Sequence, residues 1–162
     1  MTDETAVDLS AFLAQQYLCE GLTVREVQTL LDFTELVSFK KDAIIADVGE
    51  VGEALYVVVR GEAMLCFEED GRTYEIGRMR RGELVGEMSF FDREPRSVRL
   101  VAVRPDTELL RLSRVMYQRL RVEHPLIAVN LLEHAIISLD HLFRRVSEDV
   151  VTFSRYIYAR SE

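Results

Sequence analysis

The tightest constraint on the fold of this chain is an Asp70-Gly71 pair that stands between two strand-like runs. Residues 64–67 precede the pair and residues 74–76 follow it, which is the typical pattern of a β-hairpin with a two-residue turn. Similar short β-branched runs, separated by Gly and Asp, continue from residue 39 to about residue 112. Many short strands joined by turns predict an antiparallel barrel or jelly roll.

Helical patterns flank the strand-rich part of the sequence. Thr23 and Glu26 have the spacing of a capping box, in which side chains at both positions satisfy free amides of the first helical turn. Ser113 is a suitable N-cap for a helix over residues 114–122, and Pro125 can begin a longer helix.

We therefore expect a mainly β fold with flanking helices, in which residues 1–162 form a single domain. Its centre is a double-stranded β-helix (jelly-roll) barrel over about residues 37–113. N-terminal helices precede the barrel, and the C-terminal helices, of which the last is long, cover about residues 114–150.

The last predicted helix carries an apolar stripe with alternating spacings of three and four residues. Such spacing is typical of the a and d positions of a coiled coil, here about two heptads long. The stripe consists of Leu132, Ala135, Leu139, Leu142 and Val146. We expect a homodimer through this helix, and packing of the same face on the barrel is the alternative.

Composition excludes several classes of partner. The net charge of −8 argues against nucleic acid, because phosphate backbones require a basic protein surface. No apolar run approaches the roughly 20 residues that span a bilayer, so no membrane contact is expected. Cys19 and Cys66 have no C-x-x-C spacing, which favours reduced thiols and a cytoplasmic location.

The chemistry of the chain is concentrated in residues 81–97. Gly82 and Gly86 permit positive φ angles and close backbone approach, so that successive amides can face an anion. Arg96 can pair bidentately with two anionic oxygens. Glu87 brings the opposite charge and needs a hydroxyl or arginine donor to be stable in the same pocket. A sugar phosphate would supply a phosphate for Arg96 and a ribose hydroxyl for Glu87.

Two segments, Gly86-Glu87-Met88-Ser89-Phe90 and Pro95-Arg96-Ser97-Val98, together resemble a known motif. It is the phosphate-binding cassette of the cyclic-nucleotide-binding domain family, shared by the catabolite activator protein and the regulatory subunits of cAMP-dependent protein kinase. Residues 49–62 and 101–113 are similar to further segments of the family. The resemblance covers about residues 20–145 in order.

The resemblance implies roles for individual residues. Glu87 would bind the ribose 2′-hydroxyl and Arg96 the cyclic phosphate. Ser97 matches a position whose hydroxyl touches the phosphate, and serine there favours cAMP over cGMP. The other implied ligand contacts are Gly86, Met88, Ser89 and Val98, with a possible lid over the base at His141, Leu142 and Phe143.

The expected function is a cyclic nucleotide sensor that signals through its C-terminal helix to a dimer partner or an effector protein. The alternative is an interaction module of the same fold that has lost or changed its ligand specificity. Val98 and Arg99 motivate this alternative, because the family usually has small residues at both positions.

Other functions are not expected from the sequence. The histidines lie outside the predicted barrel, which argues against a barrel metal site, and no G-x-S-x-G, P-loop or Cys/His pair occurs. We therefore expect no enzyme, no metal and no cofactor. About a dozen residues follow Asp149, too few for a helix-turn-helix, so we expect a stand-alone chain without a DNA-binding domain.

Overall fold

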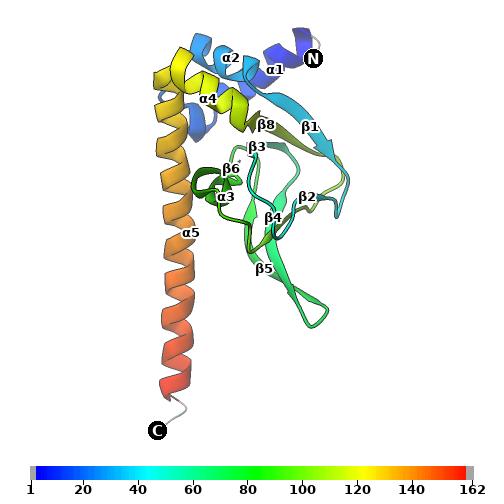
Figure 1. The fold of residues 1–162 in the computed structure, drawn as a ribbon, viewed down its shortest axis with the longest axis vertical. Coiled ribbons are helices and arrows are strands. Elements are labelled where there is room, and N and C mark those ends of the chain that lie inside the picture. Colours follow the sequence, from blue (N-terminus) through cyan, green and yellow to red (C-terminus); the bar gives the residue numbers. More distant parts are fainter. Residues whose placement is uncertain (1–2, 160–162) are drawn as a thin grey trace.

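The computed structural model describes residues 3–159, so the predicted domain limits at residues 1 and 162 lie outside the described residues. Within these residues, eight strands form two antiparallel sheets that face each other as a jelly-roll barrel (Figure 1). The strands are β1 (Glu35–Phe39), β2 (Ile44–Ala46), β3 (Ala54–Arg60), β4 (Ala63–Glu69), β5 (Arg72–Met79), β6 (Leu84–Val85), β7 (Arg99–Ala102) and β8 (Thr107–Ser113). The first sheet has the order β1-β8-β3-β6 and the second β2-β7-β4-β5. The predicted fold class is confirmed.

The β4–β5 hairpin projects from the barrel and turns at the Asp-Gly pair (Figure 1). Asp70 has a φ of 52° and Gly71 a φ of 73°, the two positive values that a type I′ turn requires. Glu69 pairs with Arg72 directly across the turn. The turn chemistry in the sequence therefore sets the register of this hairpin.

Helices stand before, within and after the barrel. They are α1 (Asp3–Ala14), the 3₁₀ turn η1 (Tyr17–Cys19), α2 (Val24–Asp32), α3 (Glu87–Asp92), α4 (Arg114–Glu123) and α5 (Pro125–Ala159). The capping box at Thr23 and Glu26 is present, and Ser113 caps α4 by accepting from the Met116 amide. α5 continues nine residues beyond the expected end at residue 150, because no Gly or Pro follows Pro125 in it.

The core has two parts, separated by the first sheet. On one face of β3, Leu55 and Val57 pack with apolar residues of the helices. On the other face, Tyr56 and Val58 fill the barrel together with residues of the second sheet, such as Leu100. Strand alternation thus lets β3 bury both faces, one toward the helices and one inside the barrel.

The first half of α5 packs on the molecule, and the second half runs past the barrel (Figure 1). Ile127 and Leu131 are buried in the core, and the Asn130 side-chain amide donates to the Leu18 carbonyl (2.5 Å). By length and apolar composition α5 could cross a membrane, the one helix of the described chain that could. Some of its apolar residues, however, pack in the protein core, and others form an exposed stripe along the helix.

That exposed stripe differs from the predicted one. Ala135 is 2% exposed and belongs to the core, and Leu142 faces the barrel, so packing on the barrel accounts for these two predicted stripe residues. An outward-facing set of apolar residues repeats every seven positions instead. We call it the α5 seam: exposed Val129, Ile136, Phe143 and Val150, with half-buried Leu132 and Leu139 and exposed Val146 and Phe153 three residues after each. Leu132 also packs against the core.

Candidate functional site

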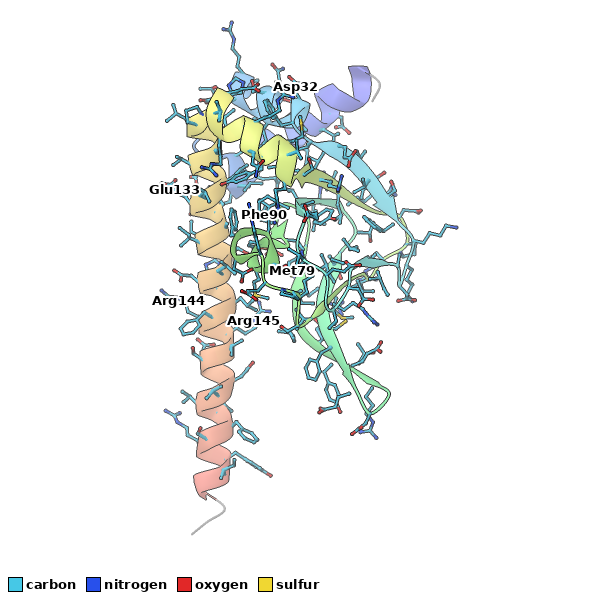
Figure 2. All side chains as sticks on the ribbon, viewed as in Figure 1. Asp32, Met79, Phe90, Glu133, Arg144 and Arg145 are labelled. Carbon is cyan, nitrogen blue, oxygen red and sulfur yellow. The ribbon has the colours of Figure 1, made fainter. Side chains whose placement is uncertain are left out.

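A cavity of about 300 Å³ lies between the barrel and α5. Its walls come from η1, from β4, β5 and β6, from the first residues of α3 and from one face of α5. Figure 2 shows Arg145 extending from α5 toward the barrel near Met79 of β5, and both residues line the cavity. The predicted site residues that also line it are Gly86, Glu87, Met88, Arg96, His141 and Leu142.

Two glycines let the backbone around α3 close tightly. Gly86 is the N-cap of α3 and has a φ of 96°, which side chains rarely adopt. A Cβ at Gly52 would lie 2.7 Å from the Phe90 amide nitrogen, so a side chain cannot fit there. The chain therefore needs glycine at both positions to bring α3 against the start of β3.

Arg96 is a buried cation with an unused donor. Its side chain is 8% exposed, and Nη2 makes a long contact of 3.4 Å to the Gly86 carbonyl. In the described part of the chain, Nε has no hydrogen-bond partner. Burial lowers the pKa of this guanidinium from its usual value, because the charged form loses water. A buried donor without a partner is costly, and an anion in the cavity would satisfy it.

Glu87 places a buried carboxyl in the same cavity, with 6% of the residue exposed. Burial raises the pKa of this carboxyl above its usual value. Hydrogen bonds from the Ser138 hydroxyl and from the amides of Gly86 and Glu87, and the charge of Arg96, act in the opposite direction. The site therefore holds a buried carboxyl next to a buried guanidinium whose Nε has no acceptor among the described residues.

Replacing Glu87 with glutamine is expected to stabilise the protein at neutral pH. Because the folded-state pKa is raised, the folded chain binds more protons than the unfolded chain between the two pKa values. The unfolding free energy of the wild type therefore falls as pH rises through this window. Glu87→Gln removes that loss, and we expect a melting temperature about 2–4 °C higher at pH 7, the shift produced by about 1 kcal/mol. Thermal unfolding between pH 4 and pH 8 measures the difference, which should shrink toward pH 4.

The matched control for this variant is Glu94→Gln, which makes the same charge change on an exposed side chain just after α3. We expect its melting temperature to follow the wild-type pH profile. A Glu87→Gln profile parallel to that of the wild type would contradict the raised pKa of Glu87.

Four predicted contact residues lie away from the cavity. Ser89 is buried and occupied within the protein: its hydroxyl accepts from the Gly52 amide (2.7 Å) and donates to the Glu94 carbonyl (2.6 Å). Ser97 is exposed and Val98 half-buried, and neither lines the cavity. Phe143 is 72% exposed and belongs to the α5 seam rather than to a lid over the cavity.

Arg99, whose charge motivated the interaction-module alternative, also lies outside the cavity. It pairs with Asp47 (2.7 Å) and Glu68 (2.9 Å), and so ties β7 to the end of β2 and to β4. The extra charge next to the cassette is therefore neutralised on the barrel surface and does not compete with Arg96.

The face of α5 that lines the cavity was not predicted as a whole. His134, Ser138, His141 and Arg145 line it with spacings of four, three and four residues, which places them on one side of a helix. This run of polar residues on a helix that also carries buried leucines is the signal that could have found them. Tyr17 and Leu18 of η1 carry no comparable signal, since they meet the cavity only through the tertiary fold.

No group of three or more His, Cys, Asp or Glu residues that could hold a metal ion occurs within residues 3–159.

The chain is similar to proteins of known class. The sequence model of the cyclic nucleotide-binding domain matches residues 36–124, more than half of the chain. A cyclic AMP receptor protein of Thermus thermophilus is 37% identical over 115 residues, 70% of this chain and 53% of that protein. A cAMP-dependent protein kinase regulatory subunit of Mucor circinelloides is 30% identical over 91 residues, 56% of this chain and 21% of that protein.

The chain thus spans about half of the first of these relatives and about a fifth of the second. The crystal structure of a cyclic nucleotide-binding domain from Methylobacillus flagellatus superposes with a TM-score of 0.78 at 22% identity. It covers 93% of this chain and 84% of that one, and at this identity it supports the fold alone.

Proposed function

Because the chain belongs to the cyclic nucleotide-binding domain family, we propose that it binds a cyclic nucleotide in the cavity between the barrel and α5. The observation that carries the proposal is the pair of buried, oppositely charged groups on the cavity wall, Glu87 and Arg96, of which Arg96 Nε has no hydrogen-bond partner among the described residues. A cyclic phosphate would accept from the Arg96 guanidinium, and a ribose hydroxyl would donate to the Glu87 carboxylate. One small molecule would satisfy both buried charges.

We propose cAMP over cGMP as the ligand, with no catalysis by this chain and no metal or cofactor. The preference rests on the resemblance at Ser97, which is exposed and outside the cavity in the free chain, whereas the cavity residues Leu65, Met79 and Leu142 would pack on either purine. Buried Cys19 and Cys66 fit the proposed cytoplasmic location, where thiols stay reduced.

Ligand binding would reach the helices by two routes. Ser138 of α5 bonds to Glu87, so a ligand hydroxyl on this carboxylate would change the contact that holds α5 against α3. Phe90 of α3 packs edge to face on Tyr117 of α4, with ring centroids 5.3 Å apart. A ligand that shifts α3 would thus bias the positions of α4 and α5, which is how binding energy becomes a population shift.

The α5 seam supports the proposal that the signal passes to a second copy of the chain. Its strict seven-residue repeat over about four heptads is the period of a left-handed coiled coil. Val129, Ile136 and Val150 are β-branched at position a, and Leu132 and Leu139 occupy position d. In a parallel coiled coil this combination favours two strands. Leu139 also lines the cavity, so the same helix would contact ligand and partner.

Isothermal titration of the protein with cAMP and cGMP tests the proposal. We expect saturable binding of both, with cAMP bound about tenfold more tightly, a difference of about 1.4 kcal/mol. The control is 5′-AMP, whose open phosphate has a different charge and shape, and we expect it to bind more weakly than either cyclic nucleotide. No heat with any cyclic nucleotide would instead favour the interaction module that has lost its ligand.

A further inference from the structure

His134 lines the cavity, and its ring carries a buried hydrogen-bond acceptor that no group in residues 3–159 uses. Its Nδ1 atom lies 2.8 Å from the Asn130 carbonyl oxygen, one turn earlier in α5. A carbonyl can only accept, so Nδ1 must carry the hydrogen, and in the neutral ring Nε2 then has a free lone pair. Nε2 is buried and without a partner, as Arg96 Nε is.

The neighbours of His134 hold its ring in place. The ring packs edge to face on Tyr17, with centroids 5.0 Å apart and planes at 69°. Asn130, which accepts from His134, donates in turn to Leu18 of the same 3₁₀ turn. The acceptor therefore has a fixed direction before any ligand enters, which lowers the cost of using it.

His134 is also next to the proposed sugar site. Ser138, which bonds to Glu87, lies one helical turn after His134 on the same face of α5. Glu87 of α3, held by Ser138, and His134 one turn before Ser138 on α5 are thus two acceptors on neighbouring parts of the cavity wall, whereas the charged donor Arg96 would serve the phosphate. A ligand with two donor groups on one side would match this wall.

We infer that His134 Nε2 accepts a hydrogen bond from a donor of the bound nucleotide, either a ribose hydroxyl or the exocyclic amine of adenine. The inference rests on the proposed function and assigns a specificity-determining residue to that site. A phosphate or a base carbonyl cannot donate to Nε2, so a ligand with such a group at this place leaves a buried acceptor unpaired. His134 would thereby select ligands by a donor at one position.

The test combines one substitution with ligands that lack one donor each. His134→Phe keeps an aromatic ring against Tyr17 and removes the acceptor. Affinities for cAMP, 2′-deoxy-cAMP and the cyclic inosine nucleotide, which has a carbonyl in place of the amine, are measured by calorimetry on both proteins. We expect the substitution to weaken cAMP binding about tenfold, the effect of one buried hydrogen bond. The loss should disappear for one of the two analogues, and that analogue identifies the donor.

His141→Phe is the matched control, because His141 also lines the cavity but is exposed. We expect its effect to be equal for all three ligands. Nitrogen NMR of the wild type should show an unprotonated Nε2 in free His134, and this signal should move with cAMP and not with the identified analogue. An equal loss, or no loss, with all three ligands would overturn the role of His134 alone. A wild type that binds none of them would overturn the proposed function as well.

Discussion

Replacement of Arg96 with alanine is expected to weaken cAMP binding by about 100- to 1,000-fold. The guanidinium is buried, its Nε has no partner in the described chain, and the proposed phosphate would be its charge-assisted acceptor. Truncating one partner of a buried charge pair costs about 2–5 kcal/mol, since the other charge is left unpaired. Calorimetric titration of the variant measures the loss directly.

The same substitution is expected to leave the fold intact. Arg96 is buried, and the contact of its Nη2 atom to the Gly86 carbonyl is long, so the unliganded protein gains little from the charge. Its lowered pKa points the same way, because it shows that burial penalises the charged form. We expect the melting temperature without ligand to stay within a few degrees of the wild type, and the stabilisation by added cAMP to vanish.

Arg99→Ala is the matched control, with the same change of charge on the adjoining strand. Arg99 pairs with Asp47 and Glu68 outside the cavity, and we expect its alanine variant to bind cAMP like the wild type. Micromolar binding retained by Arg96→Ala, or an equal loss in both variants, would remove Arg96 from the phosphate site.

The barrel and the centre of the site could be predicted because their signals are local. The turn at Asp70-Gly71 and the cap at Ser113 depend on neighbouring residues, and each is present. Gly86, Glu87 and Arg96 lie within one short segment, so their shared chemistry could be read from their spacing. The burial of Glu87 and Arg96 in one cavity could not be read from the sequence, because it depends on α5 closing the cavity from elsewhere in the chain.

The predicted apolar stripe of α5 and the predicted lid differ from the structure because they depend on which face of the helix is covered. Apolar residues of α5 form two overlapping stripes, and a spacing of three and four fits both. Ala135 and Leu142 face the molecule, whereas Ile136 and Phe143, one position later, face outward. Neighbouring positions on a helix differ by about 100°, so only the docking of α5 on the barrel decides between them. The same shift takes Phe143 out of the predicted lid and into the seam.

Two glutamates in the α5 seam are expected to convert a dimer into a monomer. Ile136 and Phe143 are 61% and 72% exposed in the single chain, so Ile136→Glu with Phe143→Glu removes no contact from the monomer core. In a parallel dimer the same position of both helices lies in the contact, so each substitution would bury two glutamate side chains there. Burial of an unpaired charge costs several kcal/mol. We expect the dissociation constant of the dimer to rise by at least about 1,000-fold. Sedimentation of the wild type and of the double variant over a range of concentrations measures it.

Thr152→Glu adds the same side chain to an exposed position of α5 outside the seam, and it should remain dimeric. A wild type that sediments as a monomer at all concentrations, or a dimer that survives the double substitution, would remove the seam as the contact surface.

Leu139 belongs to both the seam and the cavity wall, which couples ligand binding to dimerisation. If cAMP strengthens the dimer by some factor, the dimer must bind cAMP more tightly than the monomer by that factor per linked site. The double variant should therefore bind cAMP more weakly than the wild type although Ile136 and Phe143 lie outside the cavity, and equal affinities would show that α5 carries no signal between ligand and partner.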